Sequence, residues 1–553
     1  MAAAPISPPD DKGRLLSPTD KLIGRSHNLS TTARTWPHLI SVMLAAALIS
    51  IAALIYFYAN SMTNVYGDGV AHLNIARKIV DSPDRSFWQR YIQIGSPWLP
   101  LQTVLMLPLV ANNWLWRTGL AGSIISMVCF VIAAGAIYSI ARTIYDRPEA
   151  YKHHQTLPVL AAAVFVLNPS AIYIQSTPMT EMVFMAALSL AVLLFQRWVC
   201  QQTVPRLLMA AAAMSLATLS RYEAWPVAAG AILLVPFLSD GRLFERFKHT
   251  TIFALISSIG PIYWLWHNWA IYDNALEFLN GPNSARGLFL SNIPNLGWSK
   301  IFVGHLWLDG LLMLTTVAVC VGALLTLAAV AGLAGIFTTR RRLGPVFAPV
   351  VLLAIPVAFD LLSLYRGEIQ IFPFSAFGLL NVRYGLSVLP LVAVAMPGLV
   401  VMFGRRAGRA PLIAVFLLVL CQYGWLVSDG FSELAIYQEG LRNGVNSQPA
   451  RELARASAYL LQHPPGNMVL MQAGSLGPLV SKGGLLFSNV IHEGTARWHA
   501  IGDTVPNDVS TIIVQTGDLL DRRVSASGSL SADIDSNFEE VYRSGVIRIL
   551  RRR

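Results

Sequence analysis

A carboxylate stands between two glycines in the stretch Tyr66–Lys78, directly after the first long apolar segment. Glycines carry no side chain, so a ligand can approach the backbone closely on either side of Asp68. If residues 70–80 are helical, Asp68 lies at the helix start and His72 lies one turn along. Two interpretations stay open: Asp68 caps the helix and interacts with its dipole, or it is an acidic catalytic residue at a membrane surface.

A second acid, Glu181, opens a long apolar run after a short polar link. Thr177 or Thr180 is expected to cap that helix, and Glu181 is then a first-turn acid that interacts with the dipole. Alternatively, two carboxylates on one membrane face divide the work. One of them then acts as general base on an acceptor hydroxyl, while the other orients that hydroxyl or holds a metal ion.

Basic residues near these acids suit the binding of a phosphate. Arg221 and Glu223 interrupt an apolar stretch, and Arg383 begins a late apolar run. Arg221 forms either a turn with a local ion pair or a phosphate contact, since guanidinium geometry matches phosphate oxygens. Arg383 either snorkels at the interface or binds the same phosphate. Arg77 and Lys78 equally suit lipid headgroups. The candidate phosphate-binding residues are Arg221, Arg383, Lys78 and Arg77, and the supporting residues are His72, Tyr222, Glu223 and Tyr384.

Composition indicates that membrane-spanning helices position these residues. Of the 553 residues, 54% are hydrophobic and only 13% are charged, whereas about a quarter are charged in a typical soluble domain. The net charge of +11 is therefore interpreted as a topology signal and not as nucleic-acid binding. The four cysteines lack ligand spacing, which argues against a disulfide framework or a zinc site. Walker A, GxGxxG, HExxH and GxSxG motifs are absent from the sequence, which argues against a cytoplasmic nucleotide-binding domain.

Apolar runs that alternate with clusters of Arg and Lys predict about eleven spans, with a cytoplasmic N-terminus and an external C-terminus. The predicted spans are 38–58, 118–141, 157–174, 181–198, 207–219, 224–238, 250–270, 309–337, 345–364, 384–403 and 410–428. Arg340–Arg342 mark one of the cytoplasmic turns. This order places Asp68, Glu181, Arg221 and Arg383 on one external face.

Three regions follow from this division. Residues 1–36 form a polar, disordered cytoplasmic tail, and 37–428 form the membrane domain with a long first external loop, 59–117. Residues 429–553 are richer in charge and read as a small external α/β domain. Its predicted elements are an amphipathic helix over 449–462 and strands over Met468–Gln472, Thr511–Gln515 and Val541–Leu550.

The order of the short motifs resembles the GT-C superfamily of integral-membrane glycosyltransferases, close to protein mannosyltransferases and lipid A aminoarabinose transferases (glycosyltransferase family 39-like). The motifs are Tyr66-Gly67-Asp68-Gly69, Thr180-Glu181-Met182, Ser220-Arg221-Tyr222-Glu223 and Arg383-Tyr384. Protein mannosyltransferases have an Asp-Glu pair at the first motif, where this chain has Asp68-Gly69. This departure weakens the carry-over of mannose and of a protein acceptor.

The resemblance implies transfer of a sugar from a polyprenyl-phosphate-linked donor to an acceptor hydroxyl on the external face, with inversion. Arg221 and Arg383, with Lys78 or Arg77, would bind the phosphate. Asp68, assisted by Glu181, would deprotonate an acceptor on a lipid, glycan or protein. A divalent metal such as Mg²⁺ or Mn²⁺ is left open. The expected location is the bacterial plasma (inner) membrane. The alternatives are a secondary transporter and a non-catalytic, flippase-like component of glycan assembly, although the acids gather at one face and not at the midplane.

Overall fold

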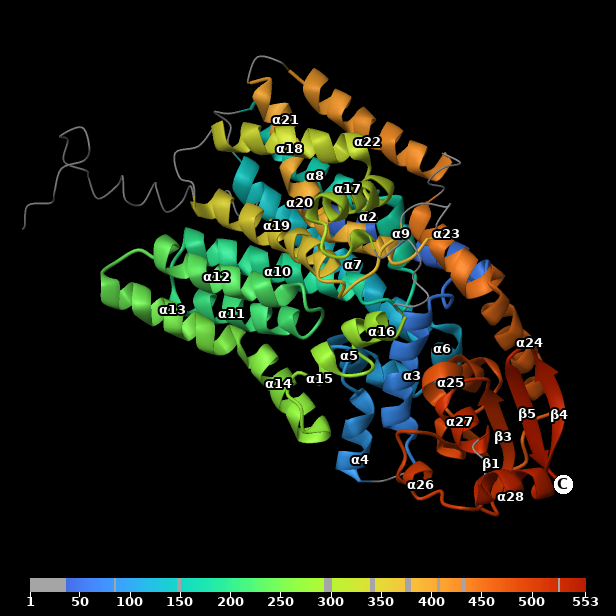
Figure 1. Cartoon of the computed structure of the whole chain (residues 1–553). Coiled ribbons are helices and arrows are strands. Elements are labelled where there is room, and N and C mark those ends of the chain that lie inside the picture. Colours follow the sequence, from blue (N-terminus) through green and yellow to red (C-terminus); the bar gives the residue numbers. More distant parts are fainter. Residues whose placement is uncertain are drawn as a thin grey trace, which may run out of the picture.

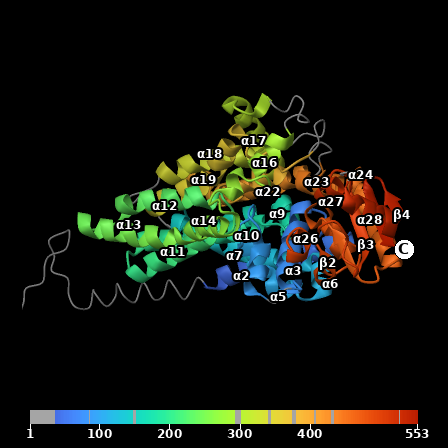
Figure 2. The ribbon, with the colours of Figure 1, turned by 60° about the horizontal axis from the view of Figure 1, so that its bottom comes forward.

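The computed structural model describes residues 36–83, 86–146, 151–292, 301–338, 344–372, 379–404, 408–428, 434–525 and 528–553. A large helical bundle and a smaller unit with a β-sheet lie side by side, with helix α3 beside the sheet-containing unit (Figure 1). Seen after a 60° turn, the sheet-containing unit still forms one end of the molecule (Figure 2). The predicted tail, 1–36, lies outside the described residues except for Trp36, and so do Arg340–Arg342.

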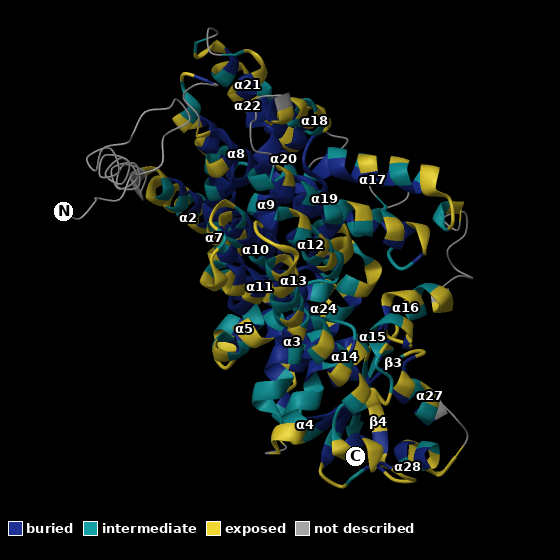
Figure 3. Cartoon of the chain, turned by 90° about the vertical axis from the view of Figure 1, so that its left-hand side faces the viewer, coloured by how far each residue is buried: buried dark blue, intermediate teal, exposed yellow. Residues whose placement is uncertain are grey.

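Six described helices are long and apolar enough to cross a membrane. They are α2 (Trp36–Ala59), α7 (Leu120–Tyr145), α10 (Glu181–Cys200), α19 (Gly344–Tyr365), the run Val382–Met402, and α22 (Ala410–Ser428). The run Val382–Met402 comprises η6 (Val382–Val388), α20 (Leu389–Ala395) and α21 (Pro397–Met402). Buried residues concentrate on inner helices such as α20, whereas outer helices such as α17 expose one face (Figure 3). The protein is thus a polytopic helical membrane protein.

Several predicted spans are divided into shorter helices, so the count of eleven stays a prediction. The predicted span 157–174 is two helices, because Asn168 caps a new helix at Pro169. Residues 309–337 form a pair bent by 104° at Val321–Gly322. The shorter helices of the bundle are α8 (Leu157–Val166), α9 (Pro169–Ile174), α11 (Val204–Thr218), α12 (Ala224–Leu238), α13 (Leu243–Ser257), α14 (Ile259–Tyr272), α15 (Glu277–Asn280), α16 (Ala285–Asn292), α17 (Leu306–Cys320) and α18 (Ala323–Thr338).

The loop after the first span contains the predicted helix, α3 (Gly67–Asp81). Leu73 and Ala76, three residues apart, share one face and are almost fully buried against the C-terminal unit and its neighbours. The rest of the loop consists of α4 (Phe87–Tyr91), η1 (Ile92–Ile94), α5 (Leu101–Val110) and α6 (Asn113–Thr118). Helix α3 packs on α5 and on α25 of the C-terminal unit, so it joins the two parts of the molecule.

The C-terminal unit has a five-stranded mixed sheet of order β2-β1-β3-β5-β4. Strands β1 and β3 lie where predicted, and helix α24 matches the predicted 449–462. The predicted strand Val541–Leu550 is wrong: Gly545, at φ +57°, turns the chain between β4 and β5, which pair antiparallel. The elements are α23 (Ala435–Leu441), η8 (Arg442–Asn446), α24 (Gln448–Gln462), β1 (Met468–Met471), α25 (Ala473–Lys482), η9 (Phe487–Asn489), β2 (Val490–Ile491), α26 (Ala496–His499), β3 (Val509–Gln515), α27 (Leu519–Ser525), α28 (Ser529–Asn537), β4 (Phe538–Ser544) and β5 (Ile547–Arg552).

Candidate functional site

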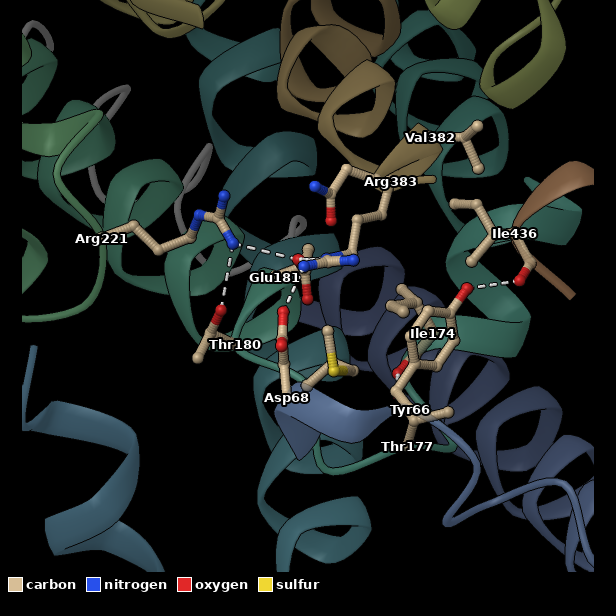
Figure 4. A network of polar contacts seen from close by, with 12 residues as sticks. Tyr66, Asp68, Ile174, Thr177, Thr180, Glu181, Arg221, Val382, Arg383 and Ile436 are labelled. Atoms are coloured by element: carbon tan, nitrogen blue, oxygen red, sulfur yellow. Dashed lines mark hydrogen bonds and ion pairs between the residues drawn. The ribbon is translucent and has the colours of Figure 1, made fainter. Parts of the chain in front are cut away.

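Four of the predicted site residues converge on one point although they are far apart in the sequence. Asp68 lies in the first turn of α3, Glu181 begins α10, Arg221 lies between α11 and α12, and Arg383 lies in the first turn of η6. Their side chains point toward one another in the close-up view (Figure 4). Since each stands at a helix end, the charged groups meet at one end of the bundle and not midway along its helices.

Arg383 is the centre of this network. Its guanidinium donates through Nε to Glu181 at 2.9 Å, through Nη1 to Glu439 at 3.4 Å, and through Nη2 to Asp68. The arginine side chain is 7% exposed. Snorkelling therefore does not describe Arg383, because its charged end faces three carboxylates inside the protein and not solvent.

Arg221 and Arg383 are linked because both donate to the same acid, Glu181. Arg221 donates through Nη1 to Glu181 at 3.0 Å and to the Thr180 hydroxyl at 3.1 Å (Figure 4). Its Nη2 lies 2.6 Å from Glu223, so the predicted local ion pair is present together with the longer-range contacts. Thr180 precedes α10 without a capping hydrogen bond from its side chain. The expected cap at this position is therefore wrong, since the Thr180 hydroxyl accepts from Arg221.

Asp68 differs from the other acids of the network in its accessibility. Its side chain is 44% exposed, whereas those of Glu181, Glu223 and Glu439 are 5%, 6% and 3% exposed. Only an accessible carboxylate can take a proton from a bound molecule, because the buried ones are enclosed by protein atoms. Among these four acids, the geometry of general-base chemistry is thus met by Asp68, and Glu181 instead holds both arginines in place.

Glu439, in α23, belongs to the network but was not predicted. Its carboxylate accepts from the backbone N–H groups of Asn381 and Val382 at 2.8 and 3.0 Å and from Arg383. Burial raises the pKa of Glu439, and the Arg383 charge opposes that shift. The sequence placed this residue in the external domain, although an acid within the otherwise apolar start of Ala435–Leu441 was a usable signal.

Asp309 and Asp360 are two further buried acids that sequence reasoning missed. They lie within α17 and α19 and are 0% and 1% exposed. None of their carboxylate oxygens has a hydrogen-bond partner among the described residues. An acid inside an apolar span is costly and for that reason often functional. Applying this rule to the predicted spans as well as to the loops would have identified Asp309 and Asp360.

A tight turn presents Arg383 to the acids. Asn381 adopts a left-handed conformation with φ of 55°, and η6 begins directly after it. Gly385 of η6 packs on the backbone of Thr316 in α17, where a Cβ would lie 2.5 Å from a carbonyl oxygen. Glycine is therefore required there, because any side chain would push η6, and Arg383 with it, away from the bent pair α17–α18.

His72 lies one turn along α3, as predicted, but it does not contact Asp68 through a hydrogen bond among the described residues. Its ring packs against Trp98 with centroids 4.7 Å apart, and burial lowers its pKa to about 4. The imidazole is consequently neutral at physiological pH. It lines the site as an uncharged ring.

The structure does not bring Arg77 and Lys78 to this network. Arg77 donates to the carbonyl oxygens of Val110 and Ala111 at 2.6 and 3.1 Å and to Asn113 at 2.7 Å. These bonds fix the end of α5, because they satisfy carbonyl groups that its last turn leaves unpaired. Arg77, which is 4% exposed, is thus held inside the protein as a structural residue. The structure thus corrects the prediction that Arg77 lies with the phosphate-binding residues.

Lys78 points to the C-terminal unit. Its Nζ lies 5.5 Å from the ring centroid of Phe487. Burial lowers the pKa of Lys78, while Glu493 opposes this shift. The Lys78 ammonium group therefore lies at the contact between α3 and the C-terminal unit, and not at the predicted phosphate-binding site.

The supporting aromatic residues line the network. Tyr384 lies beneath the Arg221 guanidinium, whose carbon is 4.9 Å from the ring centroid. Tyr222 donates to the Pro97 carbonyl at 3.2 Å and stacks on Phe278. Both tyrosines thus hold the loop that carries Arg221 against the bundle, with Glu223 beside it.

Two cavities meet at Asp68 and Arg383. We call the first the Arg221 cavity; it has a volume of about 100 Å³. It is lined by Asp68, His72, Trp98, Leu99, Met179, Thr180, Ser220, Arg221, Tyr222, Glu223, Arg383 and Tyr384. The second, the Asn443 cavity, has a volume of about 340 Å³ and opens between α3, α23 and the helices α24 and α25. Asp68 and Arg383 line both, so their ion pair stands between the two spaces.

Within the described part of the chain, no three His, Cys, Asp or Glu side chains are grouped so as to hold a metal ion. Each of the four site acids contacts Arg221, Arg383 or both. A metal ion thus stays an open expectation from the sequence resemblance.

No family model matches the sequence, and no curated protein matches it significantly. Solved structures of two GT-C glycosyltransferases resemble the chain over most of its length. ArnT from Cupriavidus metallidurans is 12% identical with a TM-score of 0.46, and the match covers 91% of this chain and 97% of ArnT. The oligosaccharyltransferase of Archaeoglobus fulgidus is 15% identical with a TM-score of 0.44, over 86% of this chain and 69% of that one. Similarity at this level concerns the course of the chain and does not establish the activity.

Proposed function

We propose that the protein is a membrane glycosyltransferase that moves a sugar from a polyprenyl-phosphate-linked donor to an acceptor hydroxyl, on the external face of a bacterial plasma membrane. The observation that carries the proposal is the exposed Asp68 carboxylate, paired with an arginine that two cavities share. A general base and a phosphate-binding cation are the two groups that such a transfer requires. Arg383 stands at the start of the apolar run Val382–Met402, with Asp68 of α3 beside it, where a lipid-linked donor would present its phosphate.

The donor phosphate has a place beside the arginines. A guanidinium carries five N–H donors, and the described partners of Arg383 take three of them. The remaining donors, with Arg221 in the smaller cavity, suit phosphate oxygens. As the phosphate binds, it competes with Asp68 for Nη2 of Arg383. Asp68 is the one exposed partner and so the one that can move.

The transfer step forms one bond and breaks another. The acceptor oxygen forms a bond to the anomeric carbon as the bond from that carbon to the phosphate oxygen breaks. The acceptor proton passes to the Asp68 carboxylate, and polyprenyl phosphate leaves with the electron pair, stabilised by Arg221 and Arg383. Attack opposite the leaving phosphate inverts the anomeric configuration.

The test is release of free polyprenyl phosphate from a labelled polyprenyl-phosphate sugar by the protein in lipid vesicles. Replacing Asp68 by Asn keeps a hydrogen bond to Arg383 but removes the base. We expect the Asp68→Asn variant to fold normally and to release the phosphate about 100- to 10,000-fold more slowly, the range that a general base contributes. Wild-type rates in this variant would refute the assignment of Asp68.

Transport is the second function class. It predicts counterflow of a labelled solute in vesicles, with no release of polyprenyl phosphate. No observation of the site favours it, because the charged groups lie at helix ends, whereas transporters bind near the bilayer midplane. Counterflow without release of the lipid phosphate would overturn the proposed transferase.

A further inference from the structure

A group of arginines lies at the opposite end of the bundle from the charged network around Arg383. Arg197 is in the last turn of α10, whereas Glu181 is the first residue of that helix. Helix α10 has 20 residues and is therefore about 30 Å long at 1.5 Å per residue. This length equals the thickness of the hydrocarbon core of a bilayer, so Arg197 stands at the other boundary of the membrane.

Two further arginines reach this position from neighbouring helices, α7 and α11, which both pack on α10. Arg142 lies in the last turn of α7, and Arg206 lies in the first turn of α11. Gln196 donates to the Ile140 carbonyl at 3.4 Å, which fixes the end of α10 beside the end of α7. Arg206 donates to the side chain of Gln201, the residue directly after α10. We call Arg142, Arg197 and Arg206 the arginine cluster.

The arginine cluster carries more positive charge than its neighbours balance. The charged groups that act on Arg197 are the two other arginines, and among the described residues no acid or other acceptor contacts its guanidinium. Of the described acids, Asp146 contacts the cluster: Arg142 Nε lies 3.8 Å from it, and His154 Nδ1 lies 2.8 Å from it. Asp146 thus compensates for one arginine at most, and the cluster attracts an anion.

The helix surface next to the arginine cluster is apolar and exposed. Leu190 lies two turns before Arg197 on the same face of α10, and Met209 lies one turn after Arg206 on α11. These two side chains are 38% and 50% exposed, and they face the membrane core because they lie within apolar helices. A ligand with a phosphate at the arginines and hydrocarbon chains along α10 and α11 would match both surfaces, since guanidinium groups suit phosphate oxygens.

We propose that the arginine cluster binds the phosphate of an anionic phospholipid, in the leaflet opposite to Asp68. A zwitterionic headgroup brings an ammonium group that the arginines repel, whereas a headgroup with a net negative charge does not. The acyl chains of the bound lipid lie along Leu190 and Met209. Because its phosphate contacts the ends of α7 and α10 and the start of α11, the lipid holds these three helices together. This binding needs neither a sugar donor nor a general base, so it is independent of the proposed function.

Native mass spectrometry of the full-length protein, released from detergent, tests this proposal. The probes are phosphatidylglycerol, phosphatidylcholine with the same acyl chains, and sn-glycerol 3-phosphate, which has the phosphate without the chains. We expect several-fold more protein with bound phosphatidylglycerol than with bound phosphatidylcholine, and no retained glycerol phosphate at the same concentration. Equal binding of the two lipids would overturn the preference for an anion. Glycerol phosphate retained as strongly as phosphatidylglycerol would overturn the assignment of a lipid.

A charge-matched pair of variants separates the arginine cluster from general attraction to basic residues. Helix α13 begins at the same end of the bundle, because Gln202, after α10, donates to the Leu238 carbonyl at the end of α12. Lys248 of α13 lies 3.7 Å from Glu245 and so already has an acid partner. Arg197→Gln should weaken phosphatidylglycerol binding about fivefold, and Lys248→Gln should leave it unchanged. Equal binding by the two variants would refute the cluster as the site, and thermal unfolding checks that both variants fold.

Discussion

The two halves of helix α3 differ in what their charged residues contact. Its first turn carries Asp68, which is 44% exposed between two cavities. Its second half carries Arg77 and Lys78, which hold the end of α5 and face the C-terminal unit. By sequence alone, both halves suited a site for an anionic substrate. The difference teaches that a charged residue becomes available for chemistry only where neighbouring backbone and packing do not already need it.

The largest expected effect lies where the first half of α3 meets the bundle. Replacing Arg383 by Gln leaves Glu439 buried without its cation, and leaves Glu181 with Arg221 alone. Breaking a buried ion pair in this way costs about 3–5 kcal/mol of stability, and the activity should be lost with it. Thermal unfolding in detergent measures the first effect. A variant as stable as the wild type would show that the three carboxylates do not need Arg383.

The next effect concerns His72, between the two halves. Its pKa is about 4 in the folded protein against 6.5 in a free side chain, so the unfolded chain binds more protons at acidic pH. This contribution to stability is complete above pH 6.5 and is lost as pH falls toward 4, in total about 3 kcal/mol. The His72→Gln variant should show a weaker fall in unfolding temperature over that range. An identical pH dependence in both proteins would exclude His72 as the cause.

A smaller effect is expected in the second half of α3. The Arg77→Gln change removes the donors to the Val110 and Ala111 carbonyls, and buried acceptors left without partners cost about 2 kcal/mol. Stability should fall, whereas the rate of phosphate release per folded molecule should stay within about twofold, because Arg77 is not at the site. A selective loss of rate would instead indicate that Arg77 binds the phosphate, and that both halves of α3 take part in the site.

The smallest effect is expected at Lys78. The Lys78→Met change keeps an unbranched side chain against Phe487 and removes an ammonium that burial disfavours. Unfolding free energy should change by only about 0.5 kcal/mol, with an unchanged rate of polyprenyl phosphate release. Slower release in this variant would show that Lys78 does contact the donor.

Sequence reasoning identified Glu181, Arg221 and Arg383 because each interrupts or begins an apolar run, and such charges are costly unless they are paired. It identified Asp68 because this acid stands between two glycines directly after the first apolar segment. The structure brings these four together. Patterns of this kind do not reveal partners. The same reasoning therefore could not separate Arg77, which contacts carbonyl groups at the end of α5 and Asp81 away from the site, from Arg221, which contacts the site acids.

Other features were missed for reasons of tertiary structure. Glu439 follows the last span and reaches the site only because α23 folds back onto Asn381 and Val382. The bend at Gly322 lies inside an uninterrupted apolar run, and it is stabilised from afar: Gln422 accepts from the backbone N–H of Leu324 at 3.2 Å. Contacts between residues so distant in sequence leave no periodicity for a local pattern to detect.

The bonds from Glu439 to the turn before Arg383 also set an order of assembly. The N–H groups of Asn381 and Val382 are satisfied by a carboxylate that the ribosome adds more than fifty residues later. The turn thus cannot complete its bonding until the last span, α22, is inserted and α23 has docked. A nascent chain halted after α22 would carry its helices but would leave Arg383 without one of its three acids. Interrupted synthesis would therefore yield an inserted bundle in which the charged network around Arg383 is not yet complete.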